Sequence, residues 1–342
     1  MKYIGKSSLI WMIILVFVFG CASKNESIGN LDEIIVFADS TDWPDYQEPL
    51  NSVFGKVYKT PRLEREYVLS WQSPKLLGGY KKSKNIFFLG WMDSNQPVST
   101  LVRNSLSKDI IDNVNSSKYF YIPKNDAWAF DQYVLFLLAP NKNELINRIQ
   151  KYGDTIYEDF EKSYYRRYKE EIYKNYENKK LEEYLLNHFP FKIRIPSDFF
   201  IANESLENNF VWIRRIDPDR SLLVHWVSFN DSMDYNYDWI VKERNKIAKI
   251  TYEGDVVVEE ETEVKTVQFL QWQALRLEGT WKNEKYLVGG PFRDITFYDE
   301  ESNLMFMVDF YVRAIGERKK MYLDMLDIMA HTFQSKAYLE SN

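Results

Sequence analysis

The chain of 342 residues has one cysteine and three histidines, and this scarcity excludes several kinds of site. A single cysteine, Cys21, cannot form an intramolecular disulfide, so packing must stabilise the fold even in an oxidising compartment. His188, His225 and His331 are far apart in the sequence and have no cysteine near them, which favours structural roles over zinc ligation. We therefore expect no metal and no cofactor.

Familiar catalytic and nucleotide-binding motifs are also missing. Beyond the N-terminal segment the sequence contains no G-x-S-x-G nucleophile elbow, no P-loop and no G-x-G-x-x-G fingerprint. Basic residues are not in excess, because 44 Lys and Arg stand against 50 Asp and Glu, for a formal net charge of −6. Nucleic-acid phosphates attract clustered positive charge, so this composition argues against a nucleic-acid partner.

The N-terminal segment has the pattern of an export signal. Lys2 and Lys6 precede an unbroken apolar run over residues 9–19. A helix of that length extends about 16 Å, whereas a hydrocarbon core is ~30 Å thick. The run therefore predicts a cleaved signal and not a membrane span.

The end of this signal resembles a lipoprotein cleavage site. Val18 and Gly20 fit the usual pattern before Cys21, whereas Phe19 is bulkier than the residue common at its position. The alternatives are an ordinary secreted protein or an uncleaved anchor, but a lone thiol in an exported chain then needs a separate explanation. We expect residues 1–20 to be removed and Cys21 to carry lipid that anchors the protein in a membrane.

The rest of the chain divides into a tether and two α+β units. Residues 21–30 are small and polar and predict a flexible tether. Residues 31–189 predict an N-terminal α+β unit that ends in a long helix, and residues 190–342 predict a C-terminal α+β unit. The expected fold class is α+β, with two antiparallel-sheet units, helices on one face, and a long amphipathic helix that joins them.

The long joining helix is expected within residues 141–188. Aromatic and aliphatic side chains recur there, mostly at four-residue spacing, between charged residues; they are Ile156, Phe160, Tyr164, Tyr168, Ile172 and Tyr176. One interpretation of this stripe is a ligand platform. The periodicity favours a face packed against a sheet, so we expect the stripe to be buried.

An acidic run in the second unit has two interpretations. Residues 259–261 are all glutamate, and Glu263 follows after one residue. A calcium site needs a turning loop, whereas this run continues an apolar strand pattern at residues 256–258. The run therefore predicts a solvated edge strand, where charge discourages pairing with another chain.

The most distinctive local pattern is Gly-Gly-Pro at residues 289–291. It is interpreted as a tight backbone passage that requires glycine dihedrals. The alternative is a pocket or binding surface formed by Trp281, Phe292 and Arg293, since Trp and Arg are enriched at binding hot spots. Trp128 is a further candidate for a binding surface.

Several short segments share a pattern with one known family. They are the start at Cys21, residues 126–129 with Gln132, Trp281 leading into residues 289–292, and the closing helix from Arg318 to Phe333. Together they resemble the lipoprotein family catalogued as domain of unknown function 4837, over nearly all of the chain after the signal. The resemblance implies an exported, lipid-anchored protein of Gram-negative bacteria, and it implies neither an activity nor site residues.

The C-terminal unit alone also resembles a second group of domains. The similarity is carried by residues 196–200, residues 210–213 and the end of the closing helix at Thr332 and Phe333. These segments resemble domains related to the PsbP photosystem subunit. That resemblance implies an antiparallel α+β fold that binds partners, and a fold alone does not establish a function.

Three functions stay open at the level of sequence. The leading hypothesis is a non-catalytic, lipid-anchored binding or assembly module of the cell envelope, expected at the outer membrane, with an envelope protein or glycan as partner. The second is a hydrolase of envelope polymers that uses a carboxylate pair, with Asp126, Glu278 and Asp294 as candidates. The third is a carrier that holds a small ligand in an aromatic pocket.

Overall fold

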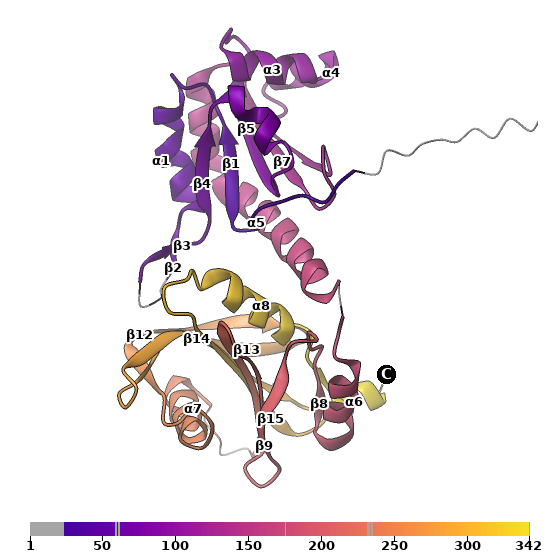
Figure 1. Ribbon diagram of the computed structural model, residues 1–342, viewed down its shortest axis with the longest axis vertical. Helices are drawn as coiled ribbons and strands as arrows, with labels where there is room; N and C mark the ends of the chain where they lie inside the picture. The colour runs from indigo at the N-terminus through magenta and orange to yellow at the C-terminus, as the bar shows by residue number, and fades with distance from the viewer. Residues whose placement is uncertain are drawn as a thin grey trace, which may run out of the picture.

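The protein has two sheet-containing domains, and helix α5 (Lys142–Tyr173) runs from the first towards the second (Figure 1). The computed structural model describes residues 24–341, apart from residues 59, 61, 175, 231, 232 and 234. The predicted signal peptide and Cys21 lie outside the described residues. No helix in the described part of the chain is long and apolar enough to cross a membrane.

The N-terminal domain is built on a five-stranded sheet. Its strands are, from one edge to the other, β4 (Val68–Gln72), β1 (Glu33–Phe37), β5 (Asn85–Trp91), β7 (Tyr133–Ala139) and β6 (Tyr121–Asn125). The first four run parallel, and β6 alone is antiparallel to its neighbour. The central strands β5 and β7 are buried on both faces, as a parallel sheet between two helix layers requires.

Helices cover both faces of this sheet. On one face, α1 (Trp43–Phe54) and α5 enclose a core with β1, β5 and β7. On the other face lie α2 (Leu77–Tyr80), α3 (Pro97–Ser105) and α4 (Lys108–Asn115). The remaining elements of the domain are short: β2 (Val57–Tyr58), β3 (Glu64–Arg65) and the 3-10 helix η1 (Pro74–Leu76).

The α+β class, with two sheets and a long helix between them, is confirmed. For the N-terminal sheet, the expectation of antiparallel strands with helices on one face is wrong. The chain passes through α1 between β1 and β4, and through α3 and α4 between β5 and β7. A crossover through a helix returns the next strand parallel to the first, and here the crossovers lie on both faces.

The expected tether is held against this domain in its second half. The backbone N–H of Ser27 donates to the carbonyl of Phe130 at 2.9 Å. The N–H of Ile28 donates to the carbonyl of Lys82 at 2.8 Å, and its own carbonyl accepts from the N–H of Lys84 at 3.0 Å. The flexible segment predicted over residues 21–30 is therefore ordered from about Ser27 onwards.

Helix α5 carries the predicted stripe, and most of that stripe is buried. Ile156, Phe160 and Tyr164 are at most 1% exposed, and Tyr168 is 6% exposed. These side chains form part of the core beneath β1, β5 and β7, so the expectation of a buried stripe is confirmed at these four positions. Tyr176 is 81% exposed and lies beyond the end of the helix.

The single helix predicted within residues 141–188 is two helices. Helix α5 ends at Tyr173, and α6 (Lys179–His188) begins after Asn178. The side-chain oxygen of Asn178 accepts a hydrogen bond from the backbone N–H of Leu181 at 3.2 Å, which is an N-cap. An asparagine that binds the backbone in this way favours a new helix start over continuation of the old helix.

The C-terminal domain is built on a seven-stranded antiparallel sheet. Its strands are, in spatial order, β12 (Val256–Phe269), β13 (Trp272–Asn283), β14 (Val288–Asp299), β15 (Leu304–Arg313), β11 (Asp219–Ser228), β10 (Phe210–Arg215) and β9 (Phe200–Ser205). Helix α7 (Tyr237–Thr251) covers one face, and α6 and α8 (Lys320–Ala330) cover the other. The antiparallel arrangement is as expected, but helices lie on both faces.

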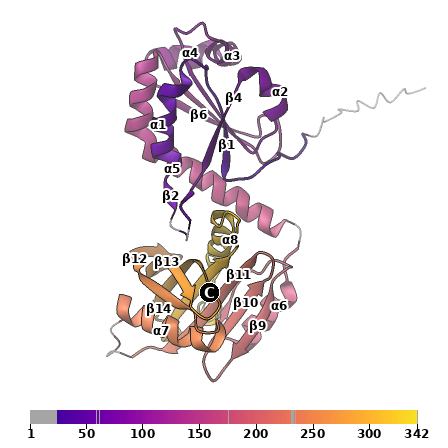
Figure 2. The ribbon, with the colours of Figure 1, turned by 60° about the vertical axis from the view of Figure 1, so that its left-hand side comes forward.

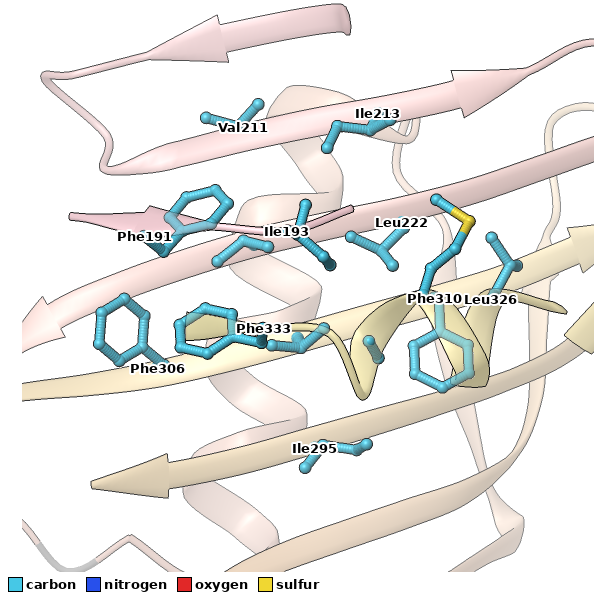
Figure 3. Packing of buried hydrophobic residues seen from close by; sticks show 14 of the residues in the cluster. Phe191, Ile193, Val211, Ile213, Leu222, Ile295, Phe306, Phe310, Leu326 and Phe333 are labelled. Atoms are coloured by element: carbon cyan, nitrogen blue, oxygen red, sulfur yellow. The ribbon is translucent and has the colours of Figure 1, made fainter. Parts of the chain in front are cut away.

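The core under α6 and α8 includes Phe333, near the C-terminus of the chain. Figure 3 shows Phe333, just past α8, among the side chains of the sheet and of the segment after α6. Its ring stacks on Phe191 at a centroid distance of 5.7 Å and meets Phe306 at 5.0 Å. The short strands β8 (Phe191–Lys192) and β16 (Gln334–Ser335) pair beside it, and α9 (Lys336–Ser341) follows.

Strand β12 is an edge strand and carries the acidic run at exposed positions. Residues 259–261 and Glu263 are all exposed. The register with β13 shifts between Val258 and Glu263, so the strand bulges where the charge is concentrated. The prediction of a solvated edge strand is confirmed.

The Gly-Gly-Pro pattern at residues 289–291 lies inside β14 and not in a turn. Gly290 pairs with Trp281 across the sheet, and its φ is outside the left-handed region. Glycine is needed here for space, because an added Cβ at Gly290 would overlap the carbonyl oxygen of Val312 on β15. The predicted requirement for glycine dihedrals is therefore wrong, and close approach of two strands replaces it.

We expect Gly290→Ala to lower the free energy of unfolding by about 1–3 kcal/mol, because β14 and β15 must move apart to admit the Cβ. Denaturant unfolding of the purified variant measures this loss. Gly79→Ala is the control, since a Cβ there meets no atom within 4 Å. An unchanged midpoint for Gly290→Ala would show that the strands accept a side chain and would contradict the prediction.

The two domains meet along α5 and α8 (Figure 2). The hydroxyl of Tyr164 donates to the carboxylate of Asp324 at 2.8 Å, and Nζ of Lys319 lies 3.0 Å from Glu64. Ile328, on α8, belongs to the core of the N-terminal domain. Because these groups are buried, α8 packs as an element of both domains.

Candidate functional site

A cavity of about 580 Å³ lies between the two domains, and we call it the interdomain cleft. Elements of both domains form its walls, with α5 on one side and β13, β14 and α8 on the other. Nine of its lining side chains are acidic or basic: Glu66, Glu161, Arg166, Lys169, Arg276, Glu278, Arg293, Asp327 and His331. The cleft is therefore a polar site and not an apolar pocket.

Strands β13 and β14 supply two arginines to the cleft, and α8 supplies the carboxylate between them. Nη1 of Arg293 lies 2.8 Å from Oδ2 of Asp327, and Nη2 of Arg276 lies 3.0 Å from the same oxygen. Glu278, opposite Arg293 in the sheet, forms an ion pair with Arg276. Both arginines are thereby held in place before any ligand arrives.

The ionisation of Asp327 and His331 is coupled. Burial favours a higher pKa for Asp327, but Arg276 and Arg293, assisted by His331, hold this pKa well below its ordinary value. Burial favours a lower pKa for His331, but the carboxylate of Asp327, 3.2 Å from Nδ1, raises this pKa overall. The wall formed by α8 thus carries the negative charge of Asp327, with Arg276, Arg293 and His331 as its neighbours.

Two glutamates share one tyrosine hydroxyl on the N-terminal wall. The hydroxyl oxygen of Tyr157 lies 2.8 Å from Glu66 and 3.0 Å from Glu161. The hydroxyl group has one proton, so it donates to one of the two carboxyl groups at a time. Burial raises the pKa of Glu161. The cleft therefore has two carboxyl groups within reach of one hydroxyl group.

The predicted binding residues do not form one surface. Trp281 and Phe292 are 2% and 0% exposed and lie in the core under α7. Arg293, the next residue along β14, lines the interdomain cleft on the other face of the sheet. Trp128 lies in the N-terminal domain, where its ring centroid is 6.1 Å from that of Phe88.

The carboxylates proposed for hydrolysis are also separate. Asp294 is 0% exposed and accepts a hydrogen bond from Thr296 at 2.7 Å; burial and the neighbouring Asp309 raise its pKa well above the ordinary value. Asp126 lines a different cavity, of about 860 Å³. Glu278 alone of the three lies in the interdomain cleft. This trio therefore does not form a catalytic centre.

Several cleft residues were not found from the sequence. Arg276 lies two positions before Glu278 in a predicted strand. Side chains two residues apart in a strand lie on the same face of the sheet, so the sequence does indicate that these two side chains are neighbours. Asp327 and Glu161 belong to two helices far apart in the chain. Nothing in the sequence pattern shows that these helices meet at one cleft.

The histidines lie apart, each with nearby polar partners. In β11, Nε2 of His225 lies 3.1 Å from Glu243 and Nδ1 lies 2.7 Å from the carbonyl of Asn209. The hydrogen bond from His225 lowers the pKa of Glu243 to about 2. His188 is the last residue of α6. Within the described ranges, no group of three or more His, Cys, Asp or Glu side chains could hold a metal ion.

Comparison with protein families finds two domains of unknown function along the chain. Residues 27–173 match Domain of unknown function (DUF8532), and residues 178–332 match Domain of unknown function (DUF4837). The family expected from the sequence is thus found, but its match covers the second half of the chain and not nearly all of it. No curated protein matches the chain.

Solved structures resemble part of the chain at low identity. A protein of Bacteroides thetaiotaomicron is 14% identical, with a TM-score of 0.28, over 43% of this chain and 45% of its own. LpqN of Mycobacterium tuberculosis, involved in cell envelope biogenesis, is 12% identical, with a TM-score of 0.28, over 42% of this chain and 82% of its own. The Ran-binding protein Mog1p of Saccharomyces cerevisiae is 11% identical, with a TM-score of 0.30, over 43% and 90%.

The family matches agree with the domains of the structure. The first match ends at residue 173, where α5 ends, and the second begins at residue 178, the N-cap of α6. Helix α6 packs in the core of the C-terminal domain. The C-terminal domain of this chain thus contains the segment that matches DUF4837, and the N-terminal domain contains the segment that matches DUF8532.

Proposed function

We propose that the protein is a lipid-anchored binding module of the cell envelope that holds its partner in the interdomain cleft. The observation that carries this proposal is the cleft itself, because both domains build its walls. Its volume, about 580 Å³, falls within the ~300–1,000 Å³ of ligand sites. The anchor and the envelope location rest on the signal pattern that ends at Cys21.

The charges at the cleft indicate a partner with anionic groups. Arg276 and Arg293 are already neutralised by Glu278 and Asp327. Lys169, exposed on α5, forms no ion pair with any residue that the structure describes. A free ammonium group at a cleft attracts acidic protein side chains or the acidic groups of an envelope glycan.

Recovery of the partner should depend on Lys169. We expect Lys169→Glu to lower recovery from detergent-solubilised envelopes by about fivefold, equivalent to ~1 kcal/mol, because attraction becomes repulsion. Quantitative mass spectrometry and glycan analysis of captured material measure the change. Lys180→Glu, an exposed lysine on α6 that does not line the cleft, is the matched control. Equal recovery with both variants would contradict binding in the cleft.

One observation favours the second candidate, a hydrolase of envelope polymers. Glu66 and Glu161 share the hydroxyl of Tyr157, and a pair of carboxyl groups is what glycoside hydrolysis uses. Under this alternative, the wild-type protein releases sugars with new reducing ends from purified peptidoglycan, and Glu161→Gln abolishes the release. If the wild-type protein releases none, the alternative is wrong and the binding proposal is unaffected.

The anchor is tested at Cys21. We expect Cys21→Ser to move the protein out of the membrane fraction, or to leave an uncleaved precursor, because the residue that receives the lipid is gone. Membrane fractionation with mass spectrometry of the mature N-terminus measures both outcomes. A free Cys21 thiol on a wild-type protein outside the membrane fraction would contradict lipidation.

A further inference from the structure

Hydrogen bonds hold the tether to one side of the N-terminal domain well before its predicted end. The carbonyl of Asn25 accepts a hydrogen bond from the N–H of Phe130 at 2.9 Å, and Glu26 forms a parallel β-bridge with Phe130. Nζ of Lys24 donates to the carbonyl of Asp126. Together with the bonds further along the tether, these contacts hold the chain against the domain from Asn25 onwards.

This attachment limits how far a lipid on Cys21 can lie from the domain. Cys21 precedes Asn25 by four residues, and four extended residues span at most about 14 Å. A tether that was free over all of residues 21–30 would span up to about 36 Å. The attached side of the N-terminal domain therefore stays within about 14 Å of the residue that carries the lipid, and so next to the membrane.

Two large apolar side chains are exposed on this side of the domain. Phe130 is 45% exposed and Ile28 is 57% exposed. Their backbones lie at the attachment itself, because Phe130 pairs with Glu26 and Ile28 pairs with Ser83. Apolar side chains that an anchor holds beside a bilayer lose contact with water when they enter the headgroup region, which favours that position.

Lysines accompany these two side chains. Three segments form this side of the domain, residues 24–30, 81–84 and 124–131, and backbone hydrogen bonds join the first segment to both of the others. Four lysines of these segments are exposed and form no ion pair with any residue that the structure describes: Lys24, Lys81, Lys82 and Lys124. Positive charge is thus concentrated where the tether is attached.

Most acidic groups of the same three segments are paired. A carboxylate oxygen of Glu26 lies 2.8 Å from Nζ of Lys174, and one of Asp131 lies 3.7 Å from Nζ of Lys84. Asp126 forms no ion pair within the described ranges, and its Oδ1 accepts a hydrogen bond from a backbone N–H at 3.3 Å. Four unpaired lysines therefore stand against one unpaired aspartate, and this surplus suits anionic phospholipid headgroups.

We propose that this surface, which we call the tether face, lies on the membrane and binds anionic phospholipid headgroups. Phe130 and Ile28 enter the headgroup region, and the four lysines pair with lipid phosphates. Attraction to headgroups falls off over ~8 Å at physiological ionic strength, so a short tether is what brings the lysines into range. The inference rests on the lipid anchor of the proposed function, and it adds the orientation of the protein on the membrane.

Quenching of a fluorescent label by brominated lipids tests this orientation. Cys21 is the only cysteine and carries the lipid, so one introduced cysteine takes a thiol-reactive dye at a chosen position. Asn125→Cys labels the tether face at an exposed residue. The control is Leu206→Cys, 66% exposed between β9 and β10 of the C-terminal domain and away from the tether (Figure 1).

The probe is a vesicle of phosphatidylcholine and phosphatidylglycerol with brominated acyl chains. We expect the label of lipidated Asn125→Cys to be quenched at least about threefold more than that of Leu206→Cys, because the tether face lies among the headgroups. Steady-state fluorescence of the two labelled proteins on the same vesicles measures the ratio.

The part played by the lysines is tested with the label at residue 125. Lys81→Glu combined with Lys82→Glu should lower its quenching by about twofold, because repulsion from phosphatidylglycerol replaces attraction. Lys242→Glu combined with Lys249→Glu, at two exposed positions on α7, is the matched control and should leave the quenching unchanged. All four side chains are exposed, so these changes leave the packed cores intact.

Equal quenching at residues 125 and 206 would overturn the proposal, because the tether face would then lie no nearer to lipid than the C-terminal domain does. Equal quenching with either pair of lysines reversed would overturn the binding of anionic headgroups. Both results leave the anchor and the interdomain cleft unaffected. Protein that does not float with the vesicles lacks the anchor, and that result contradicts the proposed function and this inference together.

Discussion

Replacing Arg244 with methionine is expected to lower the free energy of unfolding by about 3–5 kcal/mol, because it leaves a buried carboxylate without its counter-charge. Arg244 on α7 and Asp309 on β15 are each 1% exposed, and Nε lies 2.8 Å from Oδ2. Asp294, which is fully buried, lies opposite Asp309 on the neighbouring strand. One guanidinium therefore stabilises a site that contains two aspartates.

The loss should be larger at neutral pH than in mild acid. Burial raises the pKa of Asp309, and Arg244 opposes that effect, so Arg244→Met raises this pKa further. A carboxyl group with a raised pKa in the folded protein is neutral in mild acid. As the pH rises, the same group ionises in the unfolded state first, which lowers the free energy of unfolding. Urea unfolding at both pH values measures the difference. Lys246→Met, 63% exposed on the same helix, is the control.

A double variant separates the lost charge pair from lost packing. Combining Arg244→Met with Asp309→Leu removes both charges, and we expect it to recover much of the stability that the single variant loses. If the double variant is as unstable as Arg244→Met alone, or if the single variant loses the same stability at both pH values, the unpaired charge is not the cause.

Local sequence patterns predicted those features that depend on one segment. The four-residue recurrence from Ile156 to Tyr168 predicted a buried helix face, because the side chains that share a face of a helix follow from its own geometry. The glutamates at residues 259–261 predicted an exposed edge strand, because charge on an edge discourages pairing with another chain. Asn178 is a residue type that favours an N-cap, so the start of α6 is also a feature of one segment.

Features that depend on which segments become neighbours were not predicted. Sheet direction in the N-terminal domain follows from crossovers through α1 and α3, and the strand patterns alone do not show it. Gly290 was singled out correctly, but its reason is the backbone of β15, which the sequence does not place there. The interdomain cleft joins Glu161 on α5 with Asp327 on α8, and only tertiary structure brings them together.

Replacing Phe160 with alanine is expected to cost about 3–5 kcal/mol of unfolding free energy, because its ring joins α5 to the N-terminal sheet. The ring centroid lies 5.0 Å from Tyr67, 5.5 Å from Phe87 and 5.4 Å from Tyr133, and Phe160 is 0% exposed. Removal leaves a cavity among rings that other contacts hold in place, so the site cannot collapse to fill it.

The same helix provides a control variant and a variant with a smaller loss of buried volume. Lys162→Ala, at an exposed position two residues away, should change the unfolding free energy by less than about 0.5 kcal/mol. Phe160→Leu keeps part of the buried volume and should lose less than Phe160→Ala, because the penalty rises with the volume of the cavity. Denaturant unfolding of the three variants measures this order. A loss of unfolding free energy below about 1 kcal/mol for Phe160→Ala would mean that α5 and the sheet repack to fill the cavity. That result would contradict the prediction that the ring of Phe160 fixes α5 against the sheet.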